Sequence, residues 1–148
     1  MKKLFLSLAV AMIAATGFAQ APATAVVKGE DMIKFTETVH DFGKIKQGVP
    51  VTYDFVFKNV SAKPVVIESA TASCGCTTPV KPDQPVGKGK SDKIKAGFNA
   101  ASPSPFEKTI FVKVAGVAQP MEIKIKGEVL TPDAYAKYES EKVKKSGK

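Results

Sequence analysis

Residues 121–129, MEIKIKGEV, decide the fold, because apolar residues and charged residues alternate along most of their length. Met121, Ile123 and Ile125 occupy every second position, and charged residues stand between them. Successive side chains of a β-strand point to opposite faces, so this pattern predicts a strand with one buried face and one solvated face. An amphipathic helix would instead repeat its apolar residues at intervals of three and four.

The same alternation occurs in residues 51–58, VTYDFVFK. Further strand candidates lie at residues 65–67, 94–98 and 109–114, and weaker ones lie at residues 33–36 and 42–45. Gly, Pro, Asn and Ser separate these segments. Together these segments predict an all-β fold, an immunoglobulin-like antiparallel β-sandwich of about seven strands whose inner faces meet in one core. The side chains predicted to fill this core are Tyr53, Phe55, Phe57, Phe98, Ile110, Val112, Ile123 and Ile125.

The composition fits one packed domain. The chain has 148 residues, of which 44% are hydrophobic and 24% charged, and domains usually have roughly 100–200 residues. This composition excludes disorder throughout the chain. There is no Trp, and the two Cys lie two positions apart. The inter-sheet disulfide and buried Trp of antibody domains are therefore absent, and we expect apolar packing to hold the sandwich.

The first residues have the pattern of a secretory signal peptide. Lys2 and Lys3 precede an apolar run over residues 4–15, and small residues before the end of residues 1–19 predict cleavage after Ala19. The run is shorter than the ~20 residues that a transmembrane helix needs. No Cys lies near the cleavage position. We therefore expect a periplasmic or extracellular protein without a lipid anchor or a transmembrane segment.

Three further segments follow the signal peptide. Residues 20–31 are predicted to form a flexible linker, residues 32–130 the sandwich, and residues 131–148 a basic tail. In the tail, Thr131-Pro132-Asp133 combines a hydroxyl cap, a proline at the first helical position and an acid beside the positive end of the helix dipole. The tail is thus predicted to be either a short helix or unordered.

Cys74-Gly75-Cys76 is the motif with the clearest chemical character, and three interpretations compete. Cα atoms two positions apart on a strand are ~6.6–7 Å apart, so a local disulfide requires a turn, which a positive φ at Gly75 would allow. Two thiolates also suit Cu(I) or Zn²⁺, although His40 is the chain's one histidine. In the third interpretation, both cysteines are small apolar packing residues.

Residues 38–45, TVHDFGKI, form a second distinctive stretch. We expect Phe42 and Ile45 to enter the core and Gly43 to bend the backbone between two short edge strands. Histidine can activate a cysteine thiol as a nucleophile. Nothing in the sequence, however, brings His40 to the cysteine pair.

Other functional classes find little support. The chain has no G-x-S-x-G elbow, no phosphate-binding loop, no dinucleotide fingerprint and no H-E-x-x-H metal motif, so we expect no enzymatic activity and no cofactor. The formal net charge of +8 would permit nucleic-acid binding. All basic residues are Lys, however, and the export signal places the protein away from nucleic acid.

The chain resembles one known family through four segments in order: residues 40–45, 55–59, 73–77 and 125–129. This pattern is similar to that of the domain of unknown function 1573 family, and the resemblance covers roughly residues 33–129. It implies an exported bacterial immunoglobulin-like domain, similar to domains of cilium- and centrosome-associated proteins and to pilus-chaperone sandwiches, with no assigned activity. The motif residues carried over by the resemblance are His40, Asp41, Phe42, Gly43, Asn59, Cys74, Gly75, Cys76 and Thr77.

These observations favour an exported, non-enzymatic binding module of the bacterial cell envelope. We expect a protein partner, bound through an edge strand or the end loops, since both are common recognition surfaces of sandwiches. The alternative function is a thiol-redox or copper-handling role at Cys74 and Cys76.

Overall fold

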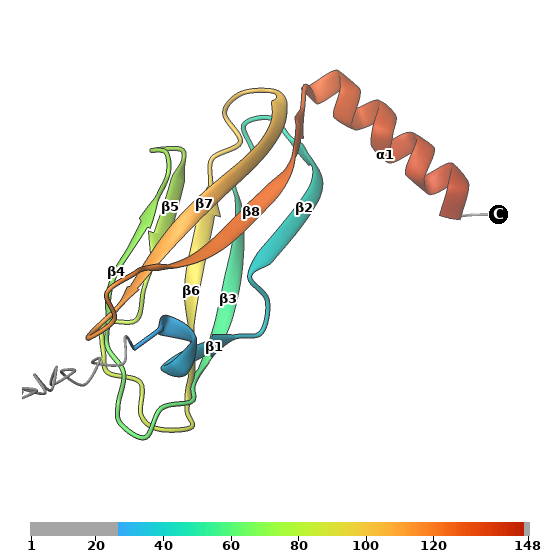
Figure 1. Cartoon of the computed structure of the whole chain (residues 1–148). Helices are drawn as coiled ribbons and strands as arrows, with labels where there is room; N and C mark the ends of the chain where they lie inside the picture. The colour runs from blue at the N-terminus through green and yellow to red at the C-terminus, as the bar shows by residue number, and fades with distance from the viewer. Residues whose placement is uncertain (1–26, 147–148) are drawn as a thin grey trace, which may run out of the picture.

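The computed structural model describes residues 27–146, which form a β-sandwich followed by a helix (Figure 1). A 3₁₀ turn at Gly29–Asp31 precedes the first strand. The elements then run in the order β1 (Ile33–Phe35), β2 (Val39–Lys46), β3 (Val51–Asn59), β4 (Ile67–Ala72), β5 (Thr77–Val80), β6 (Ser91–Phe98), β7 (Ser104–Val114), β8 (Met121–Leu130) and α1 (Pro132–Ser146).

The strands form two four-stranded sheets. The first sheet has the order β1-β3-β6-β5, and the second has the order β2-β8-β7-β4. The prediction of an immunoglobulin-like sandwich is confirmed. Its pairs are antiparallel except for β2 and β8, which run parallel. This exception arises because the chain leaves the edge of the first sheet after β1 and joins the edge of the second sheet as β2.

Strand β5 is the element that the sequence pattern did not reveal. Residues 77–80, TTPV, lack apolar alternation and contain Pro79, which cannot donate a backbone hydrogen bond. Such a proline is tolerated on an edge strand, and β5 is the edge of the first sheet. The two short edge strands predicted on either side of Gly43 are also different in the structure, because Gly43 lies inside one continuous strand, β2.

The core lies between the two sheets, as the alternation predicted. Every side chain predicted for it is buried except Tyr53, which is half-buried. Tyr53 lies near the edge of the sandwich, where its hydroxyl donates a hydrogen bond to Glu37. Phe98 and Phe106 stack with ring centroids 4.1 Å apart and join the two sheets. Each fully buried side chain of this size contributes about 1.5–3 kcal/mol of transfer free energy.

The segment before β1 contacts the sandwich. Gly29, expected in the linker, is buried, and a Cβ there would lie 2.4 Å from Cγ of Met121. The 3₁₀ turn at Gly29–Asp31 thus already packs on the sandwich. The predicted signal peptide and the linker up to residue 26 lie outside the described residues.

The tail begins as its sequence indicates. Thr131 Oγ1 accepts a hydrogen bond from the Ala134 amide at 3.3 Å, and α1 follows. The helix projects from one end of the sandwich and contacts β2 and β8 (Figure 1). Lys44 Nζ lies 5.2 Å from the centre of the Tyr138 ring at this contact. Within residues 27–146, no helix is long and apolar enough to cross a membrane.

Candidate functional site

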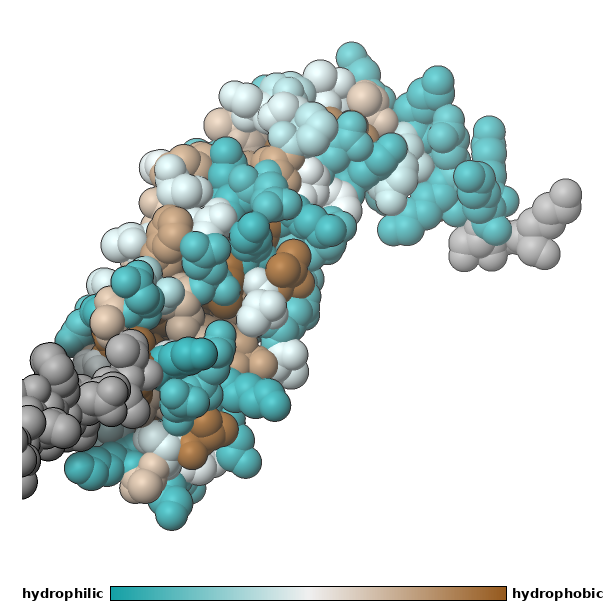
Figure 2. Space-filling view, viewed as in Figure 1, coloured by the Kyte–Doolittle hydropathy of each residue, from teal (hydrophilic) through white to brown (hydrophobic). Residues whose placement is uncertain are grey.

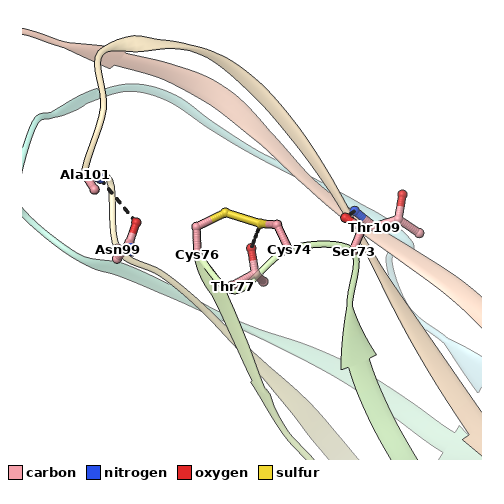
Figure 3. Close-up of a disulfide and its surroundings, with 7 residues drawn as sticks. All are labelled: Ser73, Cys74, Cys76, Thr77, Asn99, Ala101 and Thr109. Atoms are coloured by element: carbon pink, nitrogen blue, oxygen red, sulfur yellow. Dashed lines mark hydrogen bonds between the residues drawn. A yellow bond between two sulfur atoms is a disulfide. The ribbon is translucent and has the colours of Figure 1, made fainter.

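The Cys-Gly-Cys motif lies where the chain crosses between the sheets. Residues 73–76, which we call the arch, connect β4 at the edge of the second sheet to β5 at the edge of the first sheet. Cys74 and Cys76 are joined by a disulfide, with their Cα atoms 5.4 Å apart (Figure 3). Among the three interpretations, the local disulfide is therefore the one present in the structure.

The positive φ expected at Gly75 is not present in the structure. Gly75 is absent from the glycines with positive φ, and a Cβ at this position would meet no atom within 4 Å. Neither backbone conformation nor crowding within the described part of the chain therefore requires glycine there. Gly75, in the middle of the arch, is exposed.

Hydrogen bonds fix both feet of the arch. At the β4 side, the Ser73 amide donates to the Thr109 carbonyl at 2.9 Å, and the Thr109 amide donates to Ser73 Oγ at 3.3 Å. At the β5 side, the Asn99 amide donates to the Cys76 carbonyl at 3.1 Å. Thr77, a motif residue, is 4% exposed and donates its amide to the Cys74 carbonyl at 3.3 Å.

A shallow hollow of about 210 Å³ lies beside the arch. Gly97 lines it between Thr52 and Thr78, and a Cβ on Gly97 would lie 2.8 Å from Thr78 Oγ1. Gly75 and Cys76 also line it. The hollow is thus continuous with the disulfide and with the edge strand β5.

Metal and redox chemistry at the cysteines remain predictions. Both cysteines are half-buried, and in the described residues no group of three or more His, Cys, Asp and Glu side chains is arranged to hold a metal ion. Thiol counting before and after mild reductant, together with metal analysis of the purified protein, would test the thiol-redox and copper-handling alternative.

His40 belongs to a different cluster, between β2 and β3. Its ring stacks on Tyr53 with centroids 3.5 Å apart, and its Nδ1 lies 3.5 Å from Glu37 Oε1. Phe42, predicted to enter the core, is only half-buried and packs edge-on against His40. The Tyr53 hydroxyl donates to Glu37 Oε2 at 2.8 Å, and this bond, with smaller effects of desolvation and the carboxylate charge, raises the pKa of Tyr53.

Two motif segments meet where β2 runs beside β8. The pairing register shifts between Asp41 and Lys44, and Gly43 has a φ of +63°, which favours glycine. The Gly43 amide donates to Asp41 Oδ1 at 2.8 Å. A Cβ on Gly127 would lie 2.7 Å from the Gly43 carbonyl oxygen. The bulge in β2 and the glycine in β8 are therefore mutually dependent.

Asn59 is a structural residue. It is 1% exposed, and its Nδ2 donates to the carbonyls of Lys63 and Val86, both at 2.8 Å. Its Oδ1 accepts from the Ser61 amide at 2.9 Å and from Ser61 Oγ at 2.8 Å. The amide thus uses its full hydrogen-bonding capacity. It ties the loop after β3 to the segment before β6.

Sequence reasoning missed the edge that continues from the arch. Strand β4 is an edge strand, and its residues Ala70 and Ala72 are half-buried against the core. Residues 67–72, IESATA, contain neither Lys nor Pro, although Glu68 is exposed and the pairing register shifts between Ile67 and Ser69. That composition is the signal that could have drawn attention to β4, because natural edge strands commonly carry such residues.

The sheet order and the arch define an immunoglobulin-like, PapD-like β-sandwich domain. The chain belongs to the family described as "Protein of unknown function (DUF1573)", which matches residues 33–129. The family resemblance inferred from the four sequence segments is thereby confirmed. No curated protein matches the chain significantly.

Solved structures share the fold at low sequence identity. A protein of unknown function from Porphyromonas gingivalis W83 is 19% identical, with a TM-score of 0.57 over 66% of this chain and 46% of that chain. The VesB protease of Vibrio cholerae is 15% identical, with a TM-score of 0.53 over 68% and 33%. The ASH/PapD-like domain 7 of human CEP192 is 8% identical, with a TM-score of 0.52 over 85% and 99%.

The coverage differs between these structures. This chain spans less than half of the Porphyromonas and Vibrio chains but nearly all of the human domain. The similarity therefore describes the fold of a single domain and not the whole of the longer chains.

Proposed function

We propose that the protein is an exported, non-enzymatic binding module of the bacterial cell envelope, which recognises another protein through an edge of its sandwich. The observation that carries this proposal is the pair of edge strands β4 and β5, which contact each other across the two sheets and are joined by the disulfide-bonded arch. Exposed sheet edges bind extended peptide segments by strand addition.

Apolar side chains beside these edges support the proposal. Val66 precedes β4 and is 42% exposed, and Val80 ends β5 and is 60% exposed. Figure 2 shows the face that carries β7 and β8, where hydrophilic and hydrophobic residues are intermixed. An incoming strand would therefore gain apolar contact at the ends of β4 and β5 that lie away from the arch, as well as backbone hydrogen bonds.

The non-enzymatic part of the proposal rests on how the motif side chains are used. His40 stacks on Tyr53 and faces Glu37, while Asn59 uses all of its hydrogen-bonding capacity within the fold. Asp41 accepts a hydrogen bond from Gly43 and pairs with Lys126 at 3.6 Å. These polar groups hold strands and loops in place.

Export is supported by the pattern of residues 1–19. Fractionation of producing cells, with mass spectrometry of the mature N-terminus, tests this part. We expect a chain that begins at Gln20 and is recovered from the periplasm or the medium. A cytoplasmic chain that retains Lys2 and Lys3 would contradict it.

Binding is tested by crosslinking in intact cells. A photo-crosslinking residue at Val66 is expected to give a specific adduct with an envelope protein, because Val66 lies beside the proposed edge. The matched control places the same residue at Val56, which is 44% exposed on β3 and paired on both sides. Identical adduct patterns from both positions, or none from either, would contradict the proposal.

A further inference from the structure

The outer faces of the two sheets differ in how their charges are balanced. Outward-pointing side chains alternate with buried ones along each strand, so every second residue belongs to the outer face. On the second sheet, acidic side chains lie among the lysines, and three ion pairs form: Lys124 with Glu107 at 3.2 Å, Lys126 with Asp41 at 3.6 Å, and Lys44 with Glu128 at 3.9 Å. These six side chains balance one another within the face itself.

The outer face of the first sheet, which we call the lysine face, is not balanced in this way. It carries Lys34 on β1, Asp54, Val56 and Lys58 on β3, Val80 on β5, and Lys93 and Lys95 on β6. These residues have a net charge of +3 (4 − 1). Asp54 pairs with Lys93. Lys34, Lys58 and Lys95 are exposed, and within the described residues none of the three forms an ion pair.

Two of these lysines lie side by side. Lys34 stands directly opposite Lys58 in the register of β1 and β3. Like charges in directly opposite positions of an antiparallel pair destabilise the sheet. On its other side, Lys58 lies opposite Ser91 of β6, which supplies no negative charge. An anionic group in front of Lys34 and Lys58 would remove this repulsion, so the pair favours an anionic partner.

Exposed apolar side chains lie between the lysines of the same face. Val56 is 44% exposed and stands opposite Lys93, and Val80 is 60% exposed and stands opposite Lys95. Protein surfaces that lie in the membrane interface combine lysines, which contact anionic headgroups, with apolar side chains, which enter the boundary of the acyl region. The lysine face has both kinds of side chain on one sheet.

We propose that the lysine face docks on the surface of an anionic lipid bilayer. Charge complementarity carries the proposal, and the two exposed valines support it. All basic residues of the chain are Lys. Lys is depleted from protein–protein interfaces, whereas lysines beside a bilayer are attracted to its anionic headgroups. The inference goes beyond the proposed function, because it concerns the face of a sheet and not an edge.

The first test measures by sedimentation how the purified protein, without its predicted signal peptide, partitions onto lipid vesicles. The vesicles contain equal parts of phosphatidylglycerol and phosphatidylcholine, and control vesicles contain phosphatidylcholine alone. We expect binding to the anionic vesicles only, and weaker binding as the salt concentration rises. Failure to bind the anionic vesicles at about 0.1 M salt would overturn the proposal.

Two variants with the same change in net charge separate the lysine face from the charge of the whole protein. Lys34→Gln with Lys58→Gln should lower the partition constant about 25-fold, at about fivefold per lysine. Lys46→Gln with Lys126→Gln removes two exposed lysines of the second sheet and should lower it less than about threefold. The outward side chains of the two sheets lie farther apart than the Debye length of about 10 Å at about 0.1 M salt. Equal weakening in both variants would overturn the assignment to this face.

A second measurement leaves the lysines unchanged. The chain contains no Trp, so a single introduced Trp reports only its own surroundings. Val56→Trp is expected to show blue-shifted fluorescence with the anionic vesicles. The matched control is Val39→Trp, because Val39 is 42% exposed on β2 of the second sheet, and it is expected to show no shift. Circular dichroism confirms that both variants are folded. No shift at Val56, or an equal shift at Val39, would overturn the proposal.

Soluble poly-glutamate distinguishes a lipid surface from an acidic protein. Binding of poly-glutamate that requires Lys34 and Lys58, without a fluorescence shift of Val56→Trp on vesicles, would overturn the lipid surface in favour of an acidic protein partner. None of these measurements needs a partner protein. Their failure therefore leaves the crosslinking test at Val66 standing, and failure of that crosslinking test leaves the lysine face standing.

Discussion

Replacing Asn59 with alanine should remove the best-connected side chain of the domain. The wild-type side chain makes four hydrogen bonds, to Lys63, Val86 and twice to Ser61. At about 1 kcal/mol each, their loss sets an upper figure of about 4 kcal/mol. The Lys63 carbonyl keeps a bond from Ser61 Oγ, and the Val86 carbonyl keeps one from the Val65 amide. Neither carbonyl is left unpaired, so we expect about 3–4 kcal/mol.

The assay is urea denaturation followed by circular dichroism, with thermal denaturation in parallel. A loss of this size is a large part of the 5–15 kcal/mol typical of small domains, and it should lower Tm by at least about 12 °C. Ser61→Ala is the matched control, because it retains the Ser61 amide bond to Asn59 and should cost about 1 kcal/mol.

A second substitution tests the direction of the bonds. Asn59→Asp places an acceptor opposite the carbonyls of Lys63 and Val86, so at neutral pH it should destabilise the fold more than alanine does. Protonation restores one donor, and the difference from the wild type should narrow as the pH falls. If Asn59→Ala unfolds within about 1 kcal/mol of the wild type, the network does not hold the loop and the reasoning fails.

Three further predictions concern the core and the motif residues. Gly127→Ala should cost about 1–3 kcal/mol by overpacking against the Gly43 carbonyl, whereas Gly75→Ala, in open space, should stay within about 0.5 kcal/mol in the same urea assay. Phe55→Ala should cost about 3–5 kcal/mol, and an unchanged midpoint would disprove the β3 register. The pKa of Tyr53 is raised above 10.0, so its proton contributes stability below pH 10.0 that is lost as the pH rises through the folded-state pKa. Glu37→Gln should lower that pKa in an absorbance titration, and an unchanged curve would contradict the assigned hydrogen bond.

The sandwich could be predicted because its central strands alternate strictly. In β8, Ile123 and Ile125 are buried and the side chains between them are not. This burial pattern is visible in the sequence as an alternation of apolar and charged residues. Strand β5 could not be found in this way, because its pairing with β6 determines its structure and its own residues do not alternate. The parallel pairing of β2 with β8 depends on where the chain crosses between sheets, and no short-range pattern encodes that crossing.

The candidate site was predictable only in part. The spacing of Cys74 and Cys76 identified a local disulfide as one alternative, but the turn that closes it does not use the positive φ expected of Gly75. Asn59 was visible only as a motif residue, since its partner Val86 lies far along the chain. Which backbone amides of an edge strand face outward is a property of the sheet and not of the residues alone.

The parallel pair of β2 and β8 also sets the order in which the domain can be completed. Val39 pairs with Lys124 and Ile45 with Val129. Strand β2 therefore cannot pair until β8 has been synthesised. During synthesis from the N-terminus, β2 has no partner in its sheet until β8 emerges, and β7 is paired only with β4. Such non-local pairing slows folding and prolongs the exposure of unpaired strands. The second sheet consequently stays incomplete until β8 has left the ribosome.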